Sequence, residues 1–191
     1  RAMNRLLHLG PSPHVARVQA GMRWRDLQDA LDPHGLSVMS MQSYSNFTVG
    51  GAVSVNAHGR YVGTGPVGST VRALKLVLAD GSIVEATPTR NVDLFRAAIG
   101  GYGAVGVITE VELALASNRR IERFVTPVKL EAYPAWFARH VRDAPDVVLH
   151  NADLMPPDFD APVAVWWRHT DKPPTVEGRL VPRGQSYRLN Q

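Results

Sequence analysis

A stretch of small residues between Thr48 and Gly59 offers the clearest opportunity for ligand chemistry in this sequence. Thr48 is suited to cap a short helix, because its hydroxyl can accept a hydrogen bond from the first helical turn. Gly50 and Gly51 follow in that turn, where glycine lowers helix stability but lets a ligand approach the backbone. Free N–H groups and the helix dipole would attract an anion there, above all phosphate. A small-residue helix packed tightly against a sheet is the alternative interpretation.

A second glycine-rich segment, Gly101–Gly106, fits the letters of the G-x-G-x-x-G dinucleotide fingerprint. That fingerprint requires a strand before the glycines and a helix after them. Here a helical pattern at residues 93–99 precedes the glycines, and an alternating strand pattern follows at 107–115. The sequence therefore indicates a helix-to-strand turn and argues against a Rossmann site.

The remaining patterns predict the elements that must position these segments. Apolar alternation predicts strands at residues 15–20, 36–39, 71–79, 82–87, 105–115, 119–130, 147–149 and 163–167. Apolar residues at helical spacing predict helices at 23–32, 93–99 and 133–141. Asp80-Gly81 is a strong hairpin signal between two of the strands. Gly59 is expected to end the central helix. From Asp171 onward the chain is polar and rich in proline, without a core pattern.

Composition limits the classes of function. The 191 residues are 45% hydrophobic, which is ample for a buried core, and they include no cysteine. The net charge of +4 comes from scattered basic residues, so nucleic-acid binding is not expected. No apolar run is long enough to span a membrane, and we expect a cytoplasmic location. Apart from His58, the histidines are scattered and lack metal-ligand spacing, so no metal site is predicted. They are His8, His14, His34, His140, His150 and His169.

The string from Thr48 to Gly59 resembles the central FAD-contacting motif of the vanillyl-alcohol oxidase and p-cresol methylhydroxylase (PCMH) type of flavin oxidoreductases. The resemblance continues through Asp80-Gly81 and through residues 100–109, and covers roughly residues 15–116. This family includes sugar-alcohol oxidases, aldonolactone oxidases and decaprenylphosphoryl-ribose oxidases.

The resemblance implies an α+β fold. Residues 1–118 would form the second lobe of a PCMH-type FAD-binding domain, an antiparallel-rich sheet with helices on one face. Residues 119–191 would begin a substrate domain. Two family features are not found: an Arg-Gly-x-Gly-x-Ser-like phosphate loop upstream, and the rest of the substrate domain downstream. We therefore expect the chain to be a fragment of a longer protein.

The resemblance also implies which residues contact FAD. Thr48, Val49, Gly50 and Gly51 would present backbone groups to the pyrophosphate and the ribityl chain. The segment Val55, Asn56, Ala57, His58 and Gly59 would run toward the isoalloxazine ring. Gly106, Val107 and Ile108 would contact the adenosine half. Ser43 matches a position near the cofactor, although a serine that caps a turn explains it equally well.

His58 has two interpretations that the sequence leaves open. It could donate a hydrogen bond or place a charge near the flavin, or it could be a helix C-terminal histidine bonded to a carbonyl. A covalent flavin link to His58 is not expected, because the attachment histidine in such relatives lies upstream of this region.

The implied function is FAD-dependent oxidation of an alcohol. A polyol, aldonolactone or sugar-like substrate would give hydride to the flavin, and oxygen or another acceptor would reoxidise it. No catalytic base is assigned. Two alternatives remain: an NADPH-dependent flavin reductase of the enolpyruvyl-UDP-N-acetylglucosamine reductase type, and a non-catalytic nucleotide-binding module.

Overall fold

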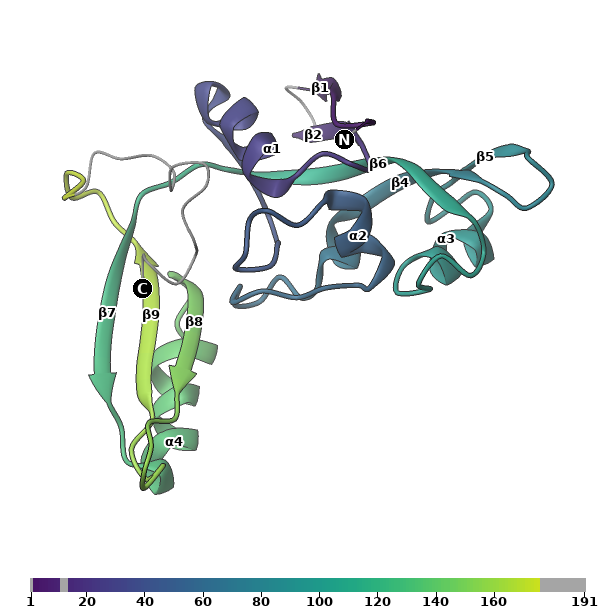
Figure 1. Cartoon of the computed structure of the whole chain (residues 1–191). Helices are drawn as coiled ribbons and strands as arrows, with labels where there is room; N and C mark the ends of the chain where they lie inside the picture. The colour runs from purple at the N-terminus through teal and green to yellow at the C-terminus, as the bar shows by residue number, and fades with distance from the viewer. Residues whose placement is uncertain (1, 11–13, 176–191) are drawn as a thin grey trace. The chain divides into compact units, whose positions relative to one another are not determined.

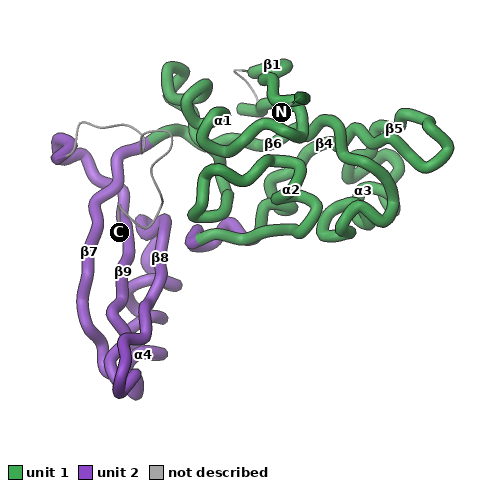
Figure 2. Tube along the Cα trace, in the orientation of Figure 1, with its two compact units in different colours: residues 1–59, 66–118, 176–191 green, residues 60–65, 119–175 purple. Residues whose placement is uncertain are grey.

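The computed structural model describes residues 2–10 and 14–175 of the chain. These residues form two compact units, coloured separately in Figure 2. The described part of unit 1 lies within residues 2–59 and 66–118, and unit 2 consists of residues 60–65 and 119–175. The short segment 60–65 thus belongs to unit 2, although the residues directly before and after it in the sequence belong to unit 1.

Unit 1 is built on an antiparallel sheet with the strand order β1-β2-β6-β4-β5 (Figure 1), and β3 pairs with one end of β6. The strands are β1 (Leu6–Gly10), β2 (Val15–Gln19), β3 (Leu36–Val38), β4 (Val71–Val77), β5 (Ile83–Ala86) and β6 (Val107–Ser117). Antiparallel strands combined with short helices confirm the expected α+β class. The Asp80-Gly81 turn joins β4 to β5, and Gly81 adopts a φ of 82° there, which glycine tolerates.

The core of unit 1 follows the alternation of the strands. Ala16 and Val18 of β2 are fully buried, whereas Arg17 between them lies on the opposite face. On that face Arg17 lies 3.3 to 3.5 Å from three carboxylates, namely those of Glu85, Glu110 and Glu112. The sheet therefore has one apolar face for helices and one face held by ion pairs.

The described part of unit 1 contains three α-helices: α1 (Trp24–Leu31), α2 (Val49–Ser54) and α3 (Val92–Ala98). Short 3-10 turns lie at Asp32–His34 and Val67–Thr70. In α1 the residues Trp24, Leu27 and Leu31 are fully buried, as their helical spacing predicted. Helix α2 packs on β2 and β6, so the central small-residue motif lies against the middle of the sheet.

The prediction that the central helix ends at Gly59 is wrong. Helix α2 ends at Ser54, and Asn56 adopts a left-handed backbone conformation with a φ of 45°. Asparagine tolerates this conformation better than most residues, so it can stop a helix where glycine would be expected. The Asn56 side chain also accepts a hydrogen bond from the Gly68 N–H at 2.9 Å, which fixes the turn that leads into β4.

Unit 2 contains a second antiparallel sheet with the order β7-β9-β8. Its strands are β7 (Ile121–Pro127), β8 (Val147–Asp153) and β9 (Val163–His169). A 3-10 turn at Leu130–Ala132 leads into α4 (Tyr133–Phe137), which continues as a π-helix over Ala138–Arg142. The predicted strands and the predicted helix are thus present with shifted bounds. Residues 171–175 have no helix or strand, and the rest of the predicted irregular tail lies outside the described residues.

The segment 60–65 joins unit 2 by backbone pairing with β8. Tyr61 forms a β-bridge with Leu149, and the Val62 N–H donates to the Val148 carbonyl at 3.0 Å. The His150 N–H donates to the Arg60 carbonyl at 2.8 Å. These bonds explain why this loop belongs structurally to a sheet that forms almost ninety residues later in the chain.

Candidate functional site

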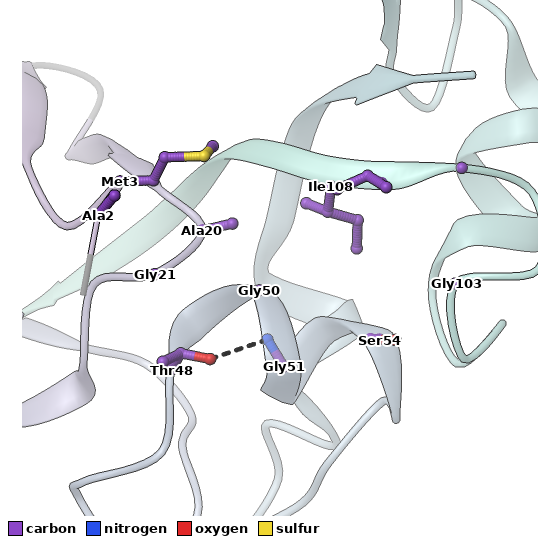
Figure 3. A pocket seen from close by; sticks show the side chains of 12 residues that line it. Ala2, Met3, Ala20, Gly21, Thr48, Gly50, Gly51, Ser54, Gly103 and Ile108 are labelled. Atoms are coloured by element: carbon purple, nitrogen blue, oxygen red, sulfur yellow. Dashed lines mark hydrogen bonds between the residues drawn. The ribbon is translucent and has the colours of Figure 1, made fainter. Parts of the chain in front are cut away.

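A pocket of about 440 Å³ lies in unit 1, where the start of α2 meets the start of β6 (Figure 3). It is lined by Ala2, Met3, Ala20, Gly21, Thr48, Gly50, Gly51, Ser54, Gly103, Gly106, Val107 and Ile108. Both glycine segments that the sequence singled out contribute to it, although they lie about fifty residues apart in the chain.

Six of the predicted site residues come together in this lining. They are Thr48, Gly50, Gly51, Gly106, Val107 and Ile108. Thr48, Gly50 and Gly51 come together with Gly106, Val107 and Ile108 because α2 packs on β2 and β6, which pair with each other in the sheet. The helix-to-strand context of Gly101–Gly106 is also as predicted, with α3 before it and β6 after it.

The hydrogen bonds at the start of α2 differ from the phosphate cradle that the sequence suggested. The Thr48 hydroxyl caps the helix and accepts from the Gly51 N–H at 3.2 Å, as predicted. The Val49 N–H donates to the Met22 carbonyl and the Gly50 N–H donates to the Ala20 carbonyl, both at 2.8 Å. The expectation of free N–H groups in this turn is therefore wrong, because the Thr48 hydroxyl uses the N–H of Gly51 and two carbonyls of the chain just after β2 use the others.

The glycines at the site lack a side chain for different steric reasons. A Cβ on Gly50 would lie 2.6 Å from the Ala20 Cβ, so Gly50 permits close packing of α2 on the chain after β2. A Cβ on Gly51 would meet only the Thr48 hydroxyl, at 2.9 Å, and Gly51 is exposed to the pocket. Gly106 has a φ of 147°, and its Cβ would lie 2.7 Å from the Val77 carbonyl oxygen.

The lining carries no charged side chain. Its polar side chains are the hydroxyls of Thr48 and Ser54, and its bulkiest apolar groups are Met3, Val107 and Ile108. Val107 is 65% exposed although it begins a core strand. A surface of backbone, small residues and exposed aliphatic groups suits an extended ligand with apolar rings better than a small anion.

The other predicted site residues lie outside the lining. Val49 is fully buried in the core, whereas Val55 is 43% exposed. The Asn56 side chain is engaged by Gly68, and the Ala57 N–H donates to the Ala52 carbonyl at 2.9 Å. The other three outside the lining are Ser43, His58 and Gly59, of which Ser43 and His58 are exposed.

The His58 side chain has one hydrogen-bond contact among residues 2–10 and 14–175. Its Nδ1 lies 3.5 Å from the Gly59 carbonyl oxygen, at the limit of a hydrogen bond. It lies beyond the end of α2, so its predicted place at the helix C-terminus is wrong, whereas the predicted contact with a carbonyl is present. The cofactor interpretation of His58 stays a prediction.

Sequence reasoning missed six lining residues: Ala2, Met3, Ala20, Gly21, Ser54 and Gly103. Gly21 offered a signal, because it follows a predicted strand. A Cβ on Gly21 would lie 2.7 Å from the carbonyl oxygens of Ala2 and Met3, so glycine is needed for the N-terminal segment to cross there. The Gly21 N–H donates to the Met3 carbonyl at 2.8 Å. No local pattern identifies Ala2 or Met3 as pocket residues.

The described ranges contain neither a cluster of metal ligands nor a membrane-spanning helix. No group of three or more histidine, aspartate or glutamate side chains there is arranged to hold a metal ion. None of the helices in the same ranges has both the length and the apolar character needed to cross a lipid bilayer.

Comparison with known proteins gives one family match and several relatives. A family model described as an FAD binding domain matches residues 1–87. The chain is 36% identical to L-gulonolactone oxidase of Mus musculus over 111 residues, which is 58% of this chain and 25% of that protein. It is 37% identical to alditol oxidase of a Streptomyces species over 101 residues, 53% of this chain and 24% of that protein.

A third relative is similar along the whole chain. Decaprenylphosphoryl-beta-D-ribose oxidase of Mycolicibacterium smegmatis is 27% identical over 100% of this chain and 39% of its own length. The chain thus spans well under half the length of the curated relatives it matches.

Proposed function

We propose that the full-length protein is an FAD-dependent oxidoreductase of alcohol-type substrates, and that residues 1–87, which match a family model described as an FAD binding domain, are part of a PCMH-type FAD-binding domain. The observation that carries the proposal is the pocket in which the Thr48–Gly51 turn meets Gly106–Ile108. The relatives named above are oxidases of a lactone, of alditols and of a ribose derivative, which favours this function over an NADPH-dependent reductase.

The residues of the pocket fit FAD. The absence of a side chain at Gly51 leaves the backbone of α2 open to a ligand, and the glycine conformation of Gly106 brings backbone to the opposite wall. Exposed Val107 and Met3 supply apolar surface for a ring system. The hydroxyls of Thr48 and Ser54 supply donors for oxygen atoms. The lining contains no cation, so phosphate charge would be balanced by groups outside it or by solvent.

Within this proposal the pocket residues hold the cofactor by backbone contact. Thr48, Gly50 and Gly51 would lie along its pyrophosphate and ribityl chain, and Gly106, Val107 and Ile108 along its adenosine half. Val55, Asn56, Ala57, His58 and Gly59 would continue the contact surface toward the flavin ring, with Ser43 nearby. Val49 would act from the core, because its fully buried side chain fixes the helix.

Bound FAD would supply the two-electron chemistry, accepting hydride from the carbon that bears the substrate hydroxyl. The chain's own contribution is to orient the cofactor and to exclude water from the apolar wall formed by Val107 and Ile108. We further propose that residues 1–118 act as the second lobe of the FAD-binding domain and that residues 119–191 begin the substrate domain. Oxygen or another acceptor would reoxidise the flavin, and the location would be cytoplasmic.

The visible absorbance spectrum of the purified full-length protein tests the proposal first. We expect a flavin spectrum that survives gel filtration, and bleaching of that spectrum when a polyol or an aldonolactone is added without oxygen. A flavin that is bleached by NADPH and by no alcohol would replace this function with a flavin reductase. A colourless protein that takes up no added FAD would refute the cofactor site.

A further inference from the structure

Unit 2 contains a row of large side chains that crosses its sheet and is not part of the pocket in unit 1. In the strand register Arg123 of β7 pairs with Trp167 of β9, and Trp167 pairs with Leu149 of β8. Tyr61 extends the row, because it bridges to Leu149 from the segment 60–65. Residues paired in this way point to the same face of a sheet.

This face is the one opposite to α4. Side chains alternate along a strand, so Trp166 lies on the other face from Trp167. Trp166 packs edge-on against Trp136 of α4, with ring centroids 5.2 Å apart, and stacks on Phe124 at 5.4 Å. His150, the partner of Trp166 in β8, contacts Phe137 at 5.3 Å. The hydrophobic packing of unit 2 is thus provided by the Trp166 face, and it does not explain the row that contains Trp167.

Two guanidinium groups converge on the Trp167 ring. The Cζ atoms of Arg60 and Arg123 each lie 6.0 Å from the ring centroid, and the two residues come from different segments of the chain. A cation over an indole gains some energy, but two like charges near one ring repel each other. Arg123 forms no ion pair with any residue that the structure describes. In contrast, Arg168 on the α4 face is paired with Asp146 at 2.7 Å.

The same face contains polar atoms without a partner. The Asn151 Oδ1 and the His169 Nδ1 are enclosed, and neither has a hydrogen-bond partner among residues 2–10 and 14–175. Asn151 lies in the next row toward Asp153, and His169 in the next row in the other direction. Enclosed polar groups are rarely left unpaired in a folded protein unless water, an ion or a ligand completes them. The carboxylate of this face, Asp153, is two rows from Arg123 and accepts from Asn151 at 3.2 Å.

We propose that Arg123, Trp167 and Arg60 form a subsite of unit 2 for the anionic group of a hydroxyl-bearing substrate, a carboxylate or a phosphate ester. Arginine binds both groups through paired N–H donors, and an indole face packs against the C–H groups of a sugar or polyol chain. The inference rests on the proposed oxidation of alcohols and adds a substrate class to it. It assigns the preference for an anionic substrate to residues of unit 2, whereas the lining of the pocket in unit 1 is uncharged.

The test compares matched neutral and anionic polyols on the full-length, FAD-loaded protein. D-glucitol is the neutral compound, D-gluconate the carboxylate and D-glucitol 6-phosphate the phosphate ester. We expect the protein to prefer at least one of the two anions. The Arg123→Gln variant should raise the KM for that anion roughly 10- to 100-fold, the usual cost of a hydrogen bond to a charged group, and should raise the KM for D-glucitol by much less. Comparing the carboxylate with the phosphate ester identifies which anion the subsite takes.

Arg139→Gln is the matched control, because Arg139 is exposed on the π-helix and lies outside the row. It should change no KM. Trp167→Phe should retain more affinity for the anion than Trp167→Leu, since only phenylalanine keeps an aromatic face. Equal KM values for neutral and anionic compounds, or an Arg123→Gln effect of the same size on both, would overturn the subsite.

A second measurement separates this inference from the proposed function. Isothermal titration calorimetry with D-gluconate and D-glucitol 6-phosphate measures binding without turnover. Binding that Arg123→Gln weakens, in a protein whose flavin no alcohol bleaches, would keep the subsite and refute the oxidase. Flavin bleaching by D-glucitol together with no detectable anion binding would do the reverse.

Discussion

Gly50 and Gly51 are adjacent and chemically identical, yet the fold uses them for different purposes. Gly50 is buried against Ala20, whereas Gly51 faces the pocket with only the Thr48 hydroxyl near its Cβ position. We expect Gly51→Val to lower FAD affinity at least about tenfold, because the new side chain occupies ligand space. Stability should change by only about 1 kcal/mol, the cost of a shifted N-cap. Fluorescence titration with FAD and thermal unfolding measure the two effects.

Gly50→Ala is the contrasting variant. Its Cβ would lie 2.6 Å from the Ala20 Cβ and 3.0 Å from the Ala20 carbonyl oxygen. Overpacking of this kind costs about 1–3 kcal/mol, so this variant should lose stability first and FAD binding as a consequence. Unchanged FAD affinity in a folded Gly51→Val protein would remove Gly51 from the cofactor site.

For individual residues, the sequence predicted the helix cap well and the hydrogen-bond partners of the backbone poorly. The role of Thr48 is local, since its hydroxyl bonds to an N–H only three residues ahead, and it was predicted. The N–H groups of Val49 and Gly50 bond to carbonyls of Met22 and Ala20. Those partners lie about thirty residues upstream and are set by how α2 docks on the sheet, so no local pattern reveals them.

Asn56 connects the end of α2 to the turn before β4, and this is where the predicted element boundary failed. Its left-handed backbone conformation, with a φ of 45°, and its hydrogen bond to the Gly68 N–H contribute separately to stability. We expect Asn56→Ala to cost about 2–3 kcal/mol, because it loses the bond and leaves alanine in a left-handed conformation. Asn56→Gly should cost only about 1 kcal/mol, since glycine accepts that conformation. Chemical denaturation measures both, and equal losses would show that the backbone conformation is unimportant.

In unit 2 the His150 ring connects α4 to the sheet and gives a pH dependence. Its Nδ1–H donates to the Val165 carbonyl at 3.0 Å, so its Nε2 accepts from the Tyr133 hydroxyl at 2.7 Å. Burial lowers the pKa of His150 below its usual value of 6.5, against the opposing effect of the bond to Val165. The imidazole of His150 therefore binds a proton more readily in the unfolded chain than in the folded chain. This contribution to stability is fully present above about pH 6.5 and is lost as the pH falls from there through the lower pKa that His150 has in the folded chain.

We expect the melting temperature of unit 2 to fall between about pH 7.5 and pH 5.5, and His150→Gln to reduce that fall. Glutamine can still donate to Val165 and accept from Tyr133, but it does not titrate in this range. His140→Gln is the control, because His140 is exposed and its ring contacts the Trp136 carbonyl of its own helical segment at 2.9 Å. A fall of the same size in His150→Gln would show that other groups cause it.

Element types were predictable because their signals are periodic and local. Alternation identified the strands, Asp80-Gly81 identified the β4–β5 hairpin, and the spacing of Trp24, Leu27 and Leu31 identified α1. The π-helix at Ala138–Arg142 has no such signal, because the same residues would fit an α-helix. Strand order depends on long-range pairing and was also beyond local patterns.

At the scale of the whole molecule, the candidate cofactor pocket and the candidate anion subsite belong to different compact units. The sequence anticipated the two sides of the pocket through a family resemblance at Thr48–Gly51 and Gly106–Ile108. It did not anticipate that Arg60–Gly65, which directly follows the central motif, belongs to unit 2. That assignment depends on hydrogen bonds to β8, and polar loop residues give no sign of a distant strand partner.

Because segment 60–65 is attached to β8, a change in this segment should affect the stability of unit 2 and leave FAD affinity unchanged. Val62→Pro removes the N–H that donates to Val148, while the extended backbone of Tyr61 remains compatible with a following proline. We expect faster hydrogen exchange of the His150 amide, which donates to Arg60, and a loss of about 1 kcal/mol in the stability of unit 2. FAD affinity should not change, because every residue that lines the pocket lies in unit 1.

Val62→Ala is the control, because it keeps the N–H and should leave the exchange rate of the His150 amide as it is. Slow exchange of His150 in Val62→Pro would show that this pairing does not hold the segment, whereas a parallel loss of FAD affinity would show that the cofactor site extends into unit 2.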